Sequence, residues 1–196
     1  NEQNAFATGV KGDEERGLTQ LGKRAISIME NLGIILDVSH ANDKTFWDIC
    51  KVATKPIIAS HSNARALCPV KRNITDEQIK AIGESGGLVG INAFNEFIHT
   101  DRDKRNVDYL VNHIEYIVDL IGIDHVAFGF DFFEYLEEDT SQTFIEDPYR
   151  GTPGIEDISK APNLMRKLQE RGFSKEDIEK MSYRNFLNLM DRVLKP

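Results

Sequence analysis

The segments IILDVSHAND (34–43) and PIIASHSNAR (56–65) have the same design, because in each an apolar run ends abruptly in Ser-His. Continuous apolar, β-branched runs of this length are typical of parallel strands that are covered on both faces. Between the two runs lie Phe46, Ile49 and Val52 at helical spacing. The pair therefore predicts a strand, a helix and a second strand, with a histidine at each strand end.

The rest of the chain repeats this order. A capping box at TDEQ (75–78) begins a helix that precedes the strand GLVGIN (87–92). A long apolar stripe from Val107 to Ile121 predicts a second such helix before the strand HVAFGFD (125–131). The remaining segments are expected to form an N-terminal helix capped by Thr19 with an apolar face from Leu21 to Leu32, a loop over 132–160, and helices at 162–171, 175–181 and 183–194.

Strands that alternate with helices predict an α/β fold with a parallel sheet and right-handed crossovers. A closed (β/α)₈ barrel needs eight strands and about 250 residues, whereas this chain has 196 residues and four predicted strands. The pattern alone leaves two architectures open, a small open sheet and half of a barrel. In either case residues 1–196 are expected to form a single domain.

Composition narrows the class of protein. The chain is 40% hydrophobic and 29% charged, as is usual for a globular domain, and its net charge is −8. Nucleic acids and anionic membranes attract clustered Lys and Arg, so neither is an expected partner. No signal peptide or membrane-spanning run is visible, which favours a cytoplasmic location. The first residues lack Met and read as a loop, as in a chain that begins within a longer protein, and two unclustered cysteines predict reduced thiols.

Polar side chains at the strand ends are the candidates for chemistry, because loops at the carboxyl ends of parallel strands carry the functional residues. These ends hold Asp37 and His40, Ser60 and His61, then Asn92, then Asp131. Adjacent strands lie ~4.8 Å apart, and zinc binds histidine nitrogen at about 2.1 Å, so His40 and His61 could bind one metal ion. Alternatively, each histidine only makes hydrogen bonds. A catalytic zinc has at least three ligands, so further ligands must come from Asp131 or from outside the chain.

Asp131 and Arg72 each have two interpretations. Asp131 is either a carboxylate that transfers a proton in the site or a structural residue, as a helix cap or in an Asx turn that stabilises its loop. Arg72, in VKRNITDE (70–77), is either a bidentate clamp for an anion or a solvated loop arginine. The other histidines carry less weight. His113 is expected on the polar side of its helix, His125 opens a strand at the end away from the site, and His99 is not expected to have a direct role.

These motifs resemble those of the membrane (renal) dipeptidase family, the M19 metallopeptidases. The likeness includes GIILDVSHANDKTFWDI, KPIIASHSNARALCPVKRNITDEQIKAIGESGGLVGIN, DHVAFGFD and the C-terminal segment from Gly154. It implies a (β/α)₈ barrel with two zinc ions that hydrolyses dipeptides. His40 and His61 then match metal ligands, Arg72 the arginine that binds the substrate carboxylate, and Asp131 the acidic residue for proton transfer.

The resemblance also implies what this chain lacks. The N-terminal His-x-Asp and the bridging Glu of the family are absent, so the chain is similar to the C-terminal half of the barrel, strands five to eight. After Asp131 the family commonly reads Phe-Asp-Gly, where this chain has Phe132, Phe133 and Glu134. The expected partners are a dipeptide and the missing half of the barrel. Because half a barrel leaves two strand edges unpaired, the alternative to binding the missing half is self-association into a homo-oligomer.

Three functions remain from the sequence. The leading hypothesis is a zinc-dependent dipeptidase of which this chain is one half, inactive by itself. The second is another amidohydrolase-like hydrolase acting on a lactone or an acyl-amino acid. The third is a non-catalytic fragment with a partial metal site at His40 and His61.

Overall fold

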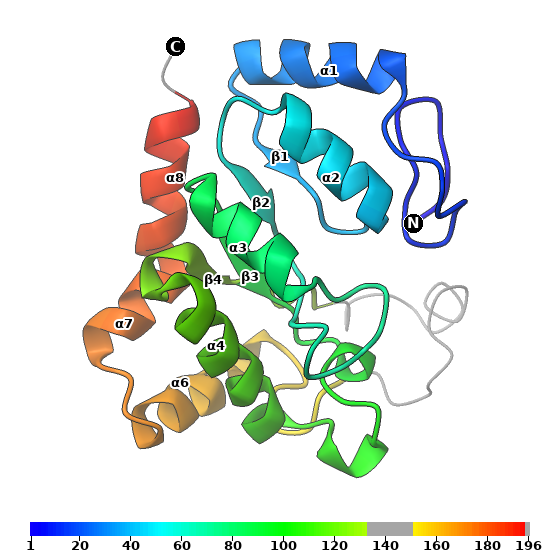
Figure 1. The fold of residues 1–196 in the computed structure, drawn as a ribbon. Helices are drawn as coiled ribbons and strands as arrows, with labels where there is room; N and C mark the ends of the chain where they lie inside the picture. Colours follow the sequence, from blue (N-terminus) through cyan, green and yellow to red (C-terminus); the bar gives the residue numbers. More distant parts are fainter. Residues whose placement is uncertain (133–150, 195–196) are drawn as a thin grey trace.

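The computed structural model describes residues 1–132 and 151–194. Within them lies one parallel sheet with the order β1-β2-β3-β4 (Figure 1). Its strands are β1 (Leu36–Asp37), β2 (Ile57–Ala59), β3 (Leu88–Ile91) and β4 (Val126–Phe128), and the helices that connect them are α2 (Asp43–Val52), α3 (Asp76–Glu84) and α4 (Val107–Ile121). The predicted α/β class and all four strands are confirmed, with shorter strands than expected.

The strand order distinguishes between the two architectures that the sequence left open. In a doubly wound sheet the order reverses at a switch point, and the crossover helices cover both faces. Here the order never reverses, so right-handed crossovers place α2, α3 and α4 on the same face of the sheet (Figure 1). A sheet in which each strand pairs with the next one along the chain, with all crossover helices on one face, is singly wound. This is the arrangement found in a segment of a (β/α)₈ barrel.

The two faces of the sheet differ in how they are covered. On the helical face, alternate residues such as Ile57, Val89 and Val126 are buried in the large core. On the opposite face, a small cluster that includes Ile58 and Leu88 is covered in part by the last helix. A groove of about 380 Å³ remains beside it, lined by residues that include Ala127, Phe186 and Leu187. Phe186 and Leu187 are 42% and 53% exposed, so this face is incompletely covered.

The C-terminal helices pack against α4 and against the amino end of β4. They are α6 (Ala161–Glu170), α7 (Lys175–Glu179), a π-helical turn (Lys180–Arg184) and α8 (Asn185–Val193). The sequence predicted a break between the last two helices, but the π turn joins them. The buried Asn185 side chain donates hydrogen bonds to the carbonyls of Ile123 and Val126, which anchors α8 beneath β4.

The predicted apolar face of the first helix was wrong in part, since of its large residues only Met29 packs against the core. Thr19 caps α1 (Gln20–Asn31) as expected, but the helix buries the row Gly22, Ile26 and Glu30. Leu21, Ile28 and Leu32 are instead 49%, 60% and 70% exposed. The Glu30 carboxylate accepts hydrogen bonds from the backbone of Thr54 and Lys55 and from the Thr54 hydroxyl, which favours this rotation of the helix.

The structure describes the predicted loop over 132–160 only in part. Residues 133–150 of this loop, among them Phe133 and Glu134, lie outside the described residues. The remainder of the loop contains a short 3₁₀ helix at Ile158–Lys160. Both cysteines are free thiols, as expected. Among the described helices none is long and apolar enough to cross a membrane.

Candidate active site

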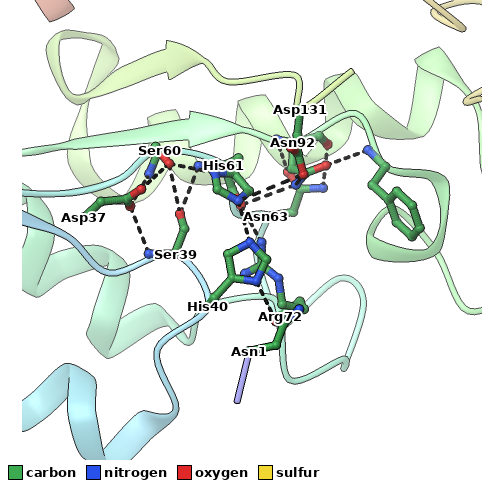
Figure 2. A network of polar contacts seen from close by, with 11 residues as sticks. Asn1, Asp37, Ser39, His40, Ser60, His61, Asn63, Arg72, Asn92 and Asp131 are labelled. Carbon is green, nitrogen blue, oxygen red and sulfur yellow. Dashed lines mark hydrogen bonds and ion pairs between the residues drawn. The ribbon is translucent and has the colours of Figure 1, made fainter. Parts of the chain in front are cut away.

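The loops after the four strands bring the predicted site residues together (Figure 2). The Nε2 atoms of His40 and His61 lie 2.8 Å apart, with ring centroids 4.9 Å apart. The convergence of two imidazoles that the strand ends predicted is therefore present. Their action as metal ligands stays a prediction.

Strained backbone positions two of the site residues. His40 has φ 70° and Asp131 has φ 60°, and they are the non-glycine residues with positive φ in the part of the chain that the structure describes. This left-handed conformation costs about 1–3 kcal/mol at a residue with a side chain and is concentrated at functional sites. The turns after β1 and β4 thus retain an unfavourable conformation that directs His40 and Asp131 toward His61 (Figure 2).

Both imidazoles are held in the neutral form. Burial, with smaller effects from Arg72 and His61, lowers the pKa of His40 to about 4. Burial also lowers the pKa of His61, against the opposing effect of Asp131. The Asn1 side-chain oxygen, 2.6 Å from His40 Nδ1, accepts a hydrogen bond from Nδ1–H, so the lone pair of His40 is on Nε2. A neutral imidazole with a free lone pair is the form that binds a metal.

The nitrogen pair fits part of a metal site. Two neutral nitrogens that face each other at 2.8 Å are suited to share a cation. The nearest carboxylate oxygen in the site, Asp131 Oδ2, is 4.0 Å from His61 Nε2. Within residues 1–132 and 151–194, no group of three His, Cys, Asp or Glu side chains converges on one point.

Arg72 lies beside the histidine pair as a half-buried cation. Its guanidinium donates a hydrogen bond to the carbonyl of His61 over 3.2 Å and stacks on Phe97, 5.2 Å from the ring centroid. Burial lowers its pKa, while Asp131 and Asp37 raise it, and an arginine stays protonated in proteins. No carboxylate of the described residues forms an ion pair with it, so its charge is available to an anion.

Two buried asparagines support the site: Asn92, one of the strand-end candidates, and Asn63, which the sequence did not single out. Asn92 donates hydrogen bonds to Asp131 Oδ2 over 3.3 Å and to the His61 carbonyl over 3.4 Å. Asn63 in turn bonds both the carbonyl and the amide of Asn92. Both are fully buried, so this amide pair joins the loops after β2, β3 and β4. The available signal was a polar residue directly after an apolar run, which Asn92 shows and Asn63 does not.

The placement predicted for His113 was wrong, because the side chain is buried with 1% exposure. Its Nδ1 accepts a hydrogen bond from the amide of Ala64 and its Nε2 donates to the carbonyl of Ile98. It therefore supports the loop that follows His61 from behind. His125 lies away from the site, as expected, since it bonds the carbonyl of Gly87 at the amino end of β3, and His99 accepts a hydrogen bond from the amide of Asp101.

His113 predicts acid destabilisation. Burial lowers its pKa from 6.5 to about 4, so the unfolded chain binds a proton between these values that the folded chain excludes. The stability that this group contributes is present above pH 6.5 and is lost as the pH falls toward 4, by about 3 kcal/mol in all. The uncharged analogue His113→Gln should therefore flatten the fall in unfolding free energy over this range, as measured by urea titration at several pH values. Equal slopes for the two proteins would contradict the assignment.

Comparison with known proteins shows the family of the chain. Residues 1–195 match the membrane dipeptidase family, peptidase family M19. The chain belongs to this family. It is 37% identical to an uncharacterized Klebsiella pneumoniae protein from the pqqA 5′ region and 32% identical to the dipeptidase aclJ of Aspergillus oryzae. The first match includes 98% of this chain and 69% of the Klebsiella pneumoniae protein. The second includes 97% of this chain and 43% of aclJ.

A solved M19-like structure shows the same fold. The metallopeptidase of Rhodobacter sphaeroides, crystallised with a phosphinate mimic of the dipeptide L-Ala-D-Ala, superimposes with a TM-score of 0.80 at 31% identity. The match covers 96% of this chain and 52% of that protein, so the chain spans about half of its length. Membership of the M19 family implies a metal ion, and the described strands correspond to one part of a barrel-like dipeptidase.

Proposed function

We propose that this chain supplies the C-terminal half, strands five to eight, of a zinc-dependent dipeptidase. The observation that carries the proposal is the pair of neutral histidine nitrogens 2.8 Å apart, beside a half-buried arginine, at the carboxyl end of a singly wound sheet. Membership of the M19 family supports it. This combination supplies nitrogen ligands and an anion-binding group within one site.

His40 and His61 would hold the metal, and the remaining ligands of a two-zinc site would come from the other half of the barrel. When bound, zinc supplies Lewis-acid chemistry at the scissile carbonyl and makes water more acidic. The histidines contribute neutral nitrogens that need no deprotonation before they bind. Asn63 and Asn92 fix the loop that carries His61, so its ring need not reorganise.

Arg72 and Asp131 would act on the substrate. The Arg72 guanidinium binds the C-terminal carboxylate of a dipeptide, since it is a cation without a carboxylate partner among the described residues. The Asp131 carboxylate, held by Asn92, carries the proton to the leaving amine. The dipeptide mimic bound by the Rhodobacter sphaeroides enzyme supports a dipeptide as the substrate class.

The open surfaces support a second half of the barrel as partner. Strands β1 and β4 are the two edges of the sheet, and an unpaired edge is a template for another strand. The apolar groove beside Ile58 and Leu88 lies on the face that a closed barrel would enclose. The chain should therefore bind a matching N-terminal half, and without it should self-associate.

Complementation tests the proposal. The chain alone should not hydrolyse L-Ala-D-Ala with zinc added, whereas a mixture with the unmatched N-terminal part of the Rhodobacter sphaeroides enzyme should do so. In the mixture, His61→Ala should abolish activity, and the matched change His125→Ala, at the other end of the sheet, should retain it. Equal activity of the chain alone would show that the ligands have been misplaced, and an active His61→Ala mixture would refute the metal site.

A further inference from the structure

The environment of His61 Nδ1, the ring nitrogen that faces away from His40, is also organised (Figure 2). Asp37, at the end of β1, lies beside Ser60, which follows β2, because these strands pair in parallel. The Ser60 hydroxyl oxygen is 2.5 Å from Asp37 Oδ2 and 2.6 Å from His61 Nδ1. Its longer contact, 3.5 Å to the Ser39 hydroxyl, is weak by comparison.

The direction of these hydrogen bonds follows from the chemistry of the groups. A carboxylate only accepts hydrogen bonds, so the single Ser60 proton is directed to Asp37. The Ser60 oxygen must then accept from His61, which places the imidazole proton on Nδ1. The lone pair of neutral His61 is consequently on Nε2, 2.8 Å from Nε2 of His40.

We propose that Asp37 and Ser60 are positioning residues that fix the tautomer and ring orientation of His61, so that its Nε2 is presented as a metal ligand. This inference rests on the proposed function in that the ligand is a metal. Residues that hold the second nitrogen of a ligating histidine typically change metal affinity by about 10- to 100-fold when replaced. The Ser39 hydroxyl assists by accepting from the His61 amide over 3.0 Å.

The same three side chains do not form a nucleophilic serine triad. In such a triad the histidine lies between the serine and the carboxylate and takes the serine proton. Here the serine lies between the carboxylate and the histidine, and its proton points to Asp37. Ser60 is thus oriented to accept from His61 rather than to attack a substrate.

The position of Asp37 makes one substitution especially informative. Its Oδ1 accepts from the amides of Ser39 and Ser60 over 2.9 and 3.0 Å. In Asp37→Asn, these two donors retain the side-chain oxygen at the Oδ1 position, which leaves the NH₂ group facing the Ser60 hydroxyl. The hydroxyl must then donate to His61 Nδ1, so the imidazole proton moves to Nε2 and the ligand is lost.

Imidazole ¹⁵N NMR of the metal-free chain, followed by titration with Zn²⁺, tests the inference. Wild type should show His61 protonated on Nδ1, and Asp37→Asn should show it protonated on Nε2, with zinc binding weakened about 10- to 100-fold. Ser60→Ala should lose the Nδ1 preference and weaken zinc, and Ser60→Thr should restore both. The control is Ser62→Ala, since the buried Ser62 hydroxyl has no hydrogen-bond partner among the described residues.

An Nδ1-protonated His61 with unchanged zinc affinity in Asp37→Asn and Ser60→Ala would overturn the inference. The tautomer is read without metal, so it is independent of the dipeptidase assignment. If the tautomers change as expected but the complemented enzyme has no dipeptidase activity, the proposed function fails and the positioning of His61 by Asp37 and Ser60 stands. Circular dichroism establishes whether each variant is folded. If Asp37→Asn does not fold, the result for Ser60→Ala decides the test.

Discussion

In the completed barrel, Asp131→Asn is expected to lower kcat for dipeptides by about 10²- to 10⁴-fold, the usual contribution of a positioned acid or base. The substitution preserves size and the contact with Asn92, but an amide does not carry a proton to the leaving amine. Asparagine also tolerates the left-handed backbone that Asp131 adopts, so the loop should keep its conformation. Zinc content should stay at the wild-type value, because a carboxylate that only carries the proton does not hold the metal.

The measurement pairs steady-state kinetics with zinc stoichiometry on the same preparation. Asp124→Asn is a matched control, since Asp124 is paired with Lys180 at the opposite end of β4 and should keep wild-type kcat. A loss of zinc in proportion to the loss of activity would instead identify Asp131 as a metal ligand. Unchanged kcat would leave it with a purely structural function in its loop.

The strand ends made much of the site predictable. His40, His61, Asn92 and Asp131 each follow an apolar run, and parallel strands place such ends at one edge of a sheet. Local signals also defined the capping box at Thr75 and Gln78, which the structure contains. These features depend on neighbours in the sequence or on the period of a strand, so one chain is enough to reveal them.

Other features depend on packing between distant segments. The rotation of α1 depends on the contacts of Glu30 with Thr54 and Lys55, which outweigh the apolar stripe. His113 is buried because its two ring nitrogens satisfy Ala64 and Ile98, two backbone groups from separate loops. Helical periodicity carries no information about such partners, so it assigned His113 to the polar side.

The choice between an open sheet and half a barrel also required the structure. The sequence contains strand-helix repeats in both cases, and only the spatial order β1-β2-β3-β4 distinguishes them. The hydrogen-bond directions around His61 were equally inaccessible, since they depend on atoms of Asp37 and Ser60 that approach only when β1 and β2 pair. Ser-His at a strand end marks the ligand but not the group that orients it.

Arg72→Lys is expected to raise KM for dipeptides by about 10- to 100-fold with a smaller change in kcat. A hydrogen bond to a charged group is worth about 1.5–3 kcal/mol, and a lysine ammonium does not reproduce the planar bidentate fork of a guanidinium on a carboxylate. The change also removes the stacking on Phe97 and the contact with the His61 carbonyl, which preorganise the guanidinium. Arg24→Lys, an exposed arginine on α1, is the matched control and should retain wild-type KM.

Substrate charge separates carboxylate recognition from a general effect on the site. Dipeptide amides lack the C-terminal charge, so wild type should hydrolyse them poorly and Arg72→Lys should affect them little. The ratio of kcat/KM for dipeptide over amide should therefore collapse in the variant. If both substrates lose the same factor, Arg72 does not bind the carboxylate, and its contact with the carbonyl of His61 would be its contribution, through the orientation of the metal-ligand loop.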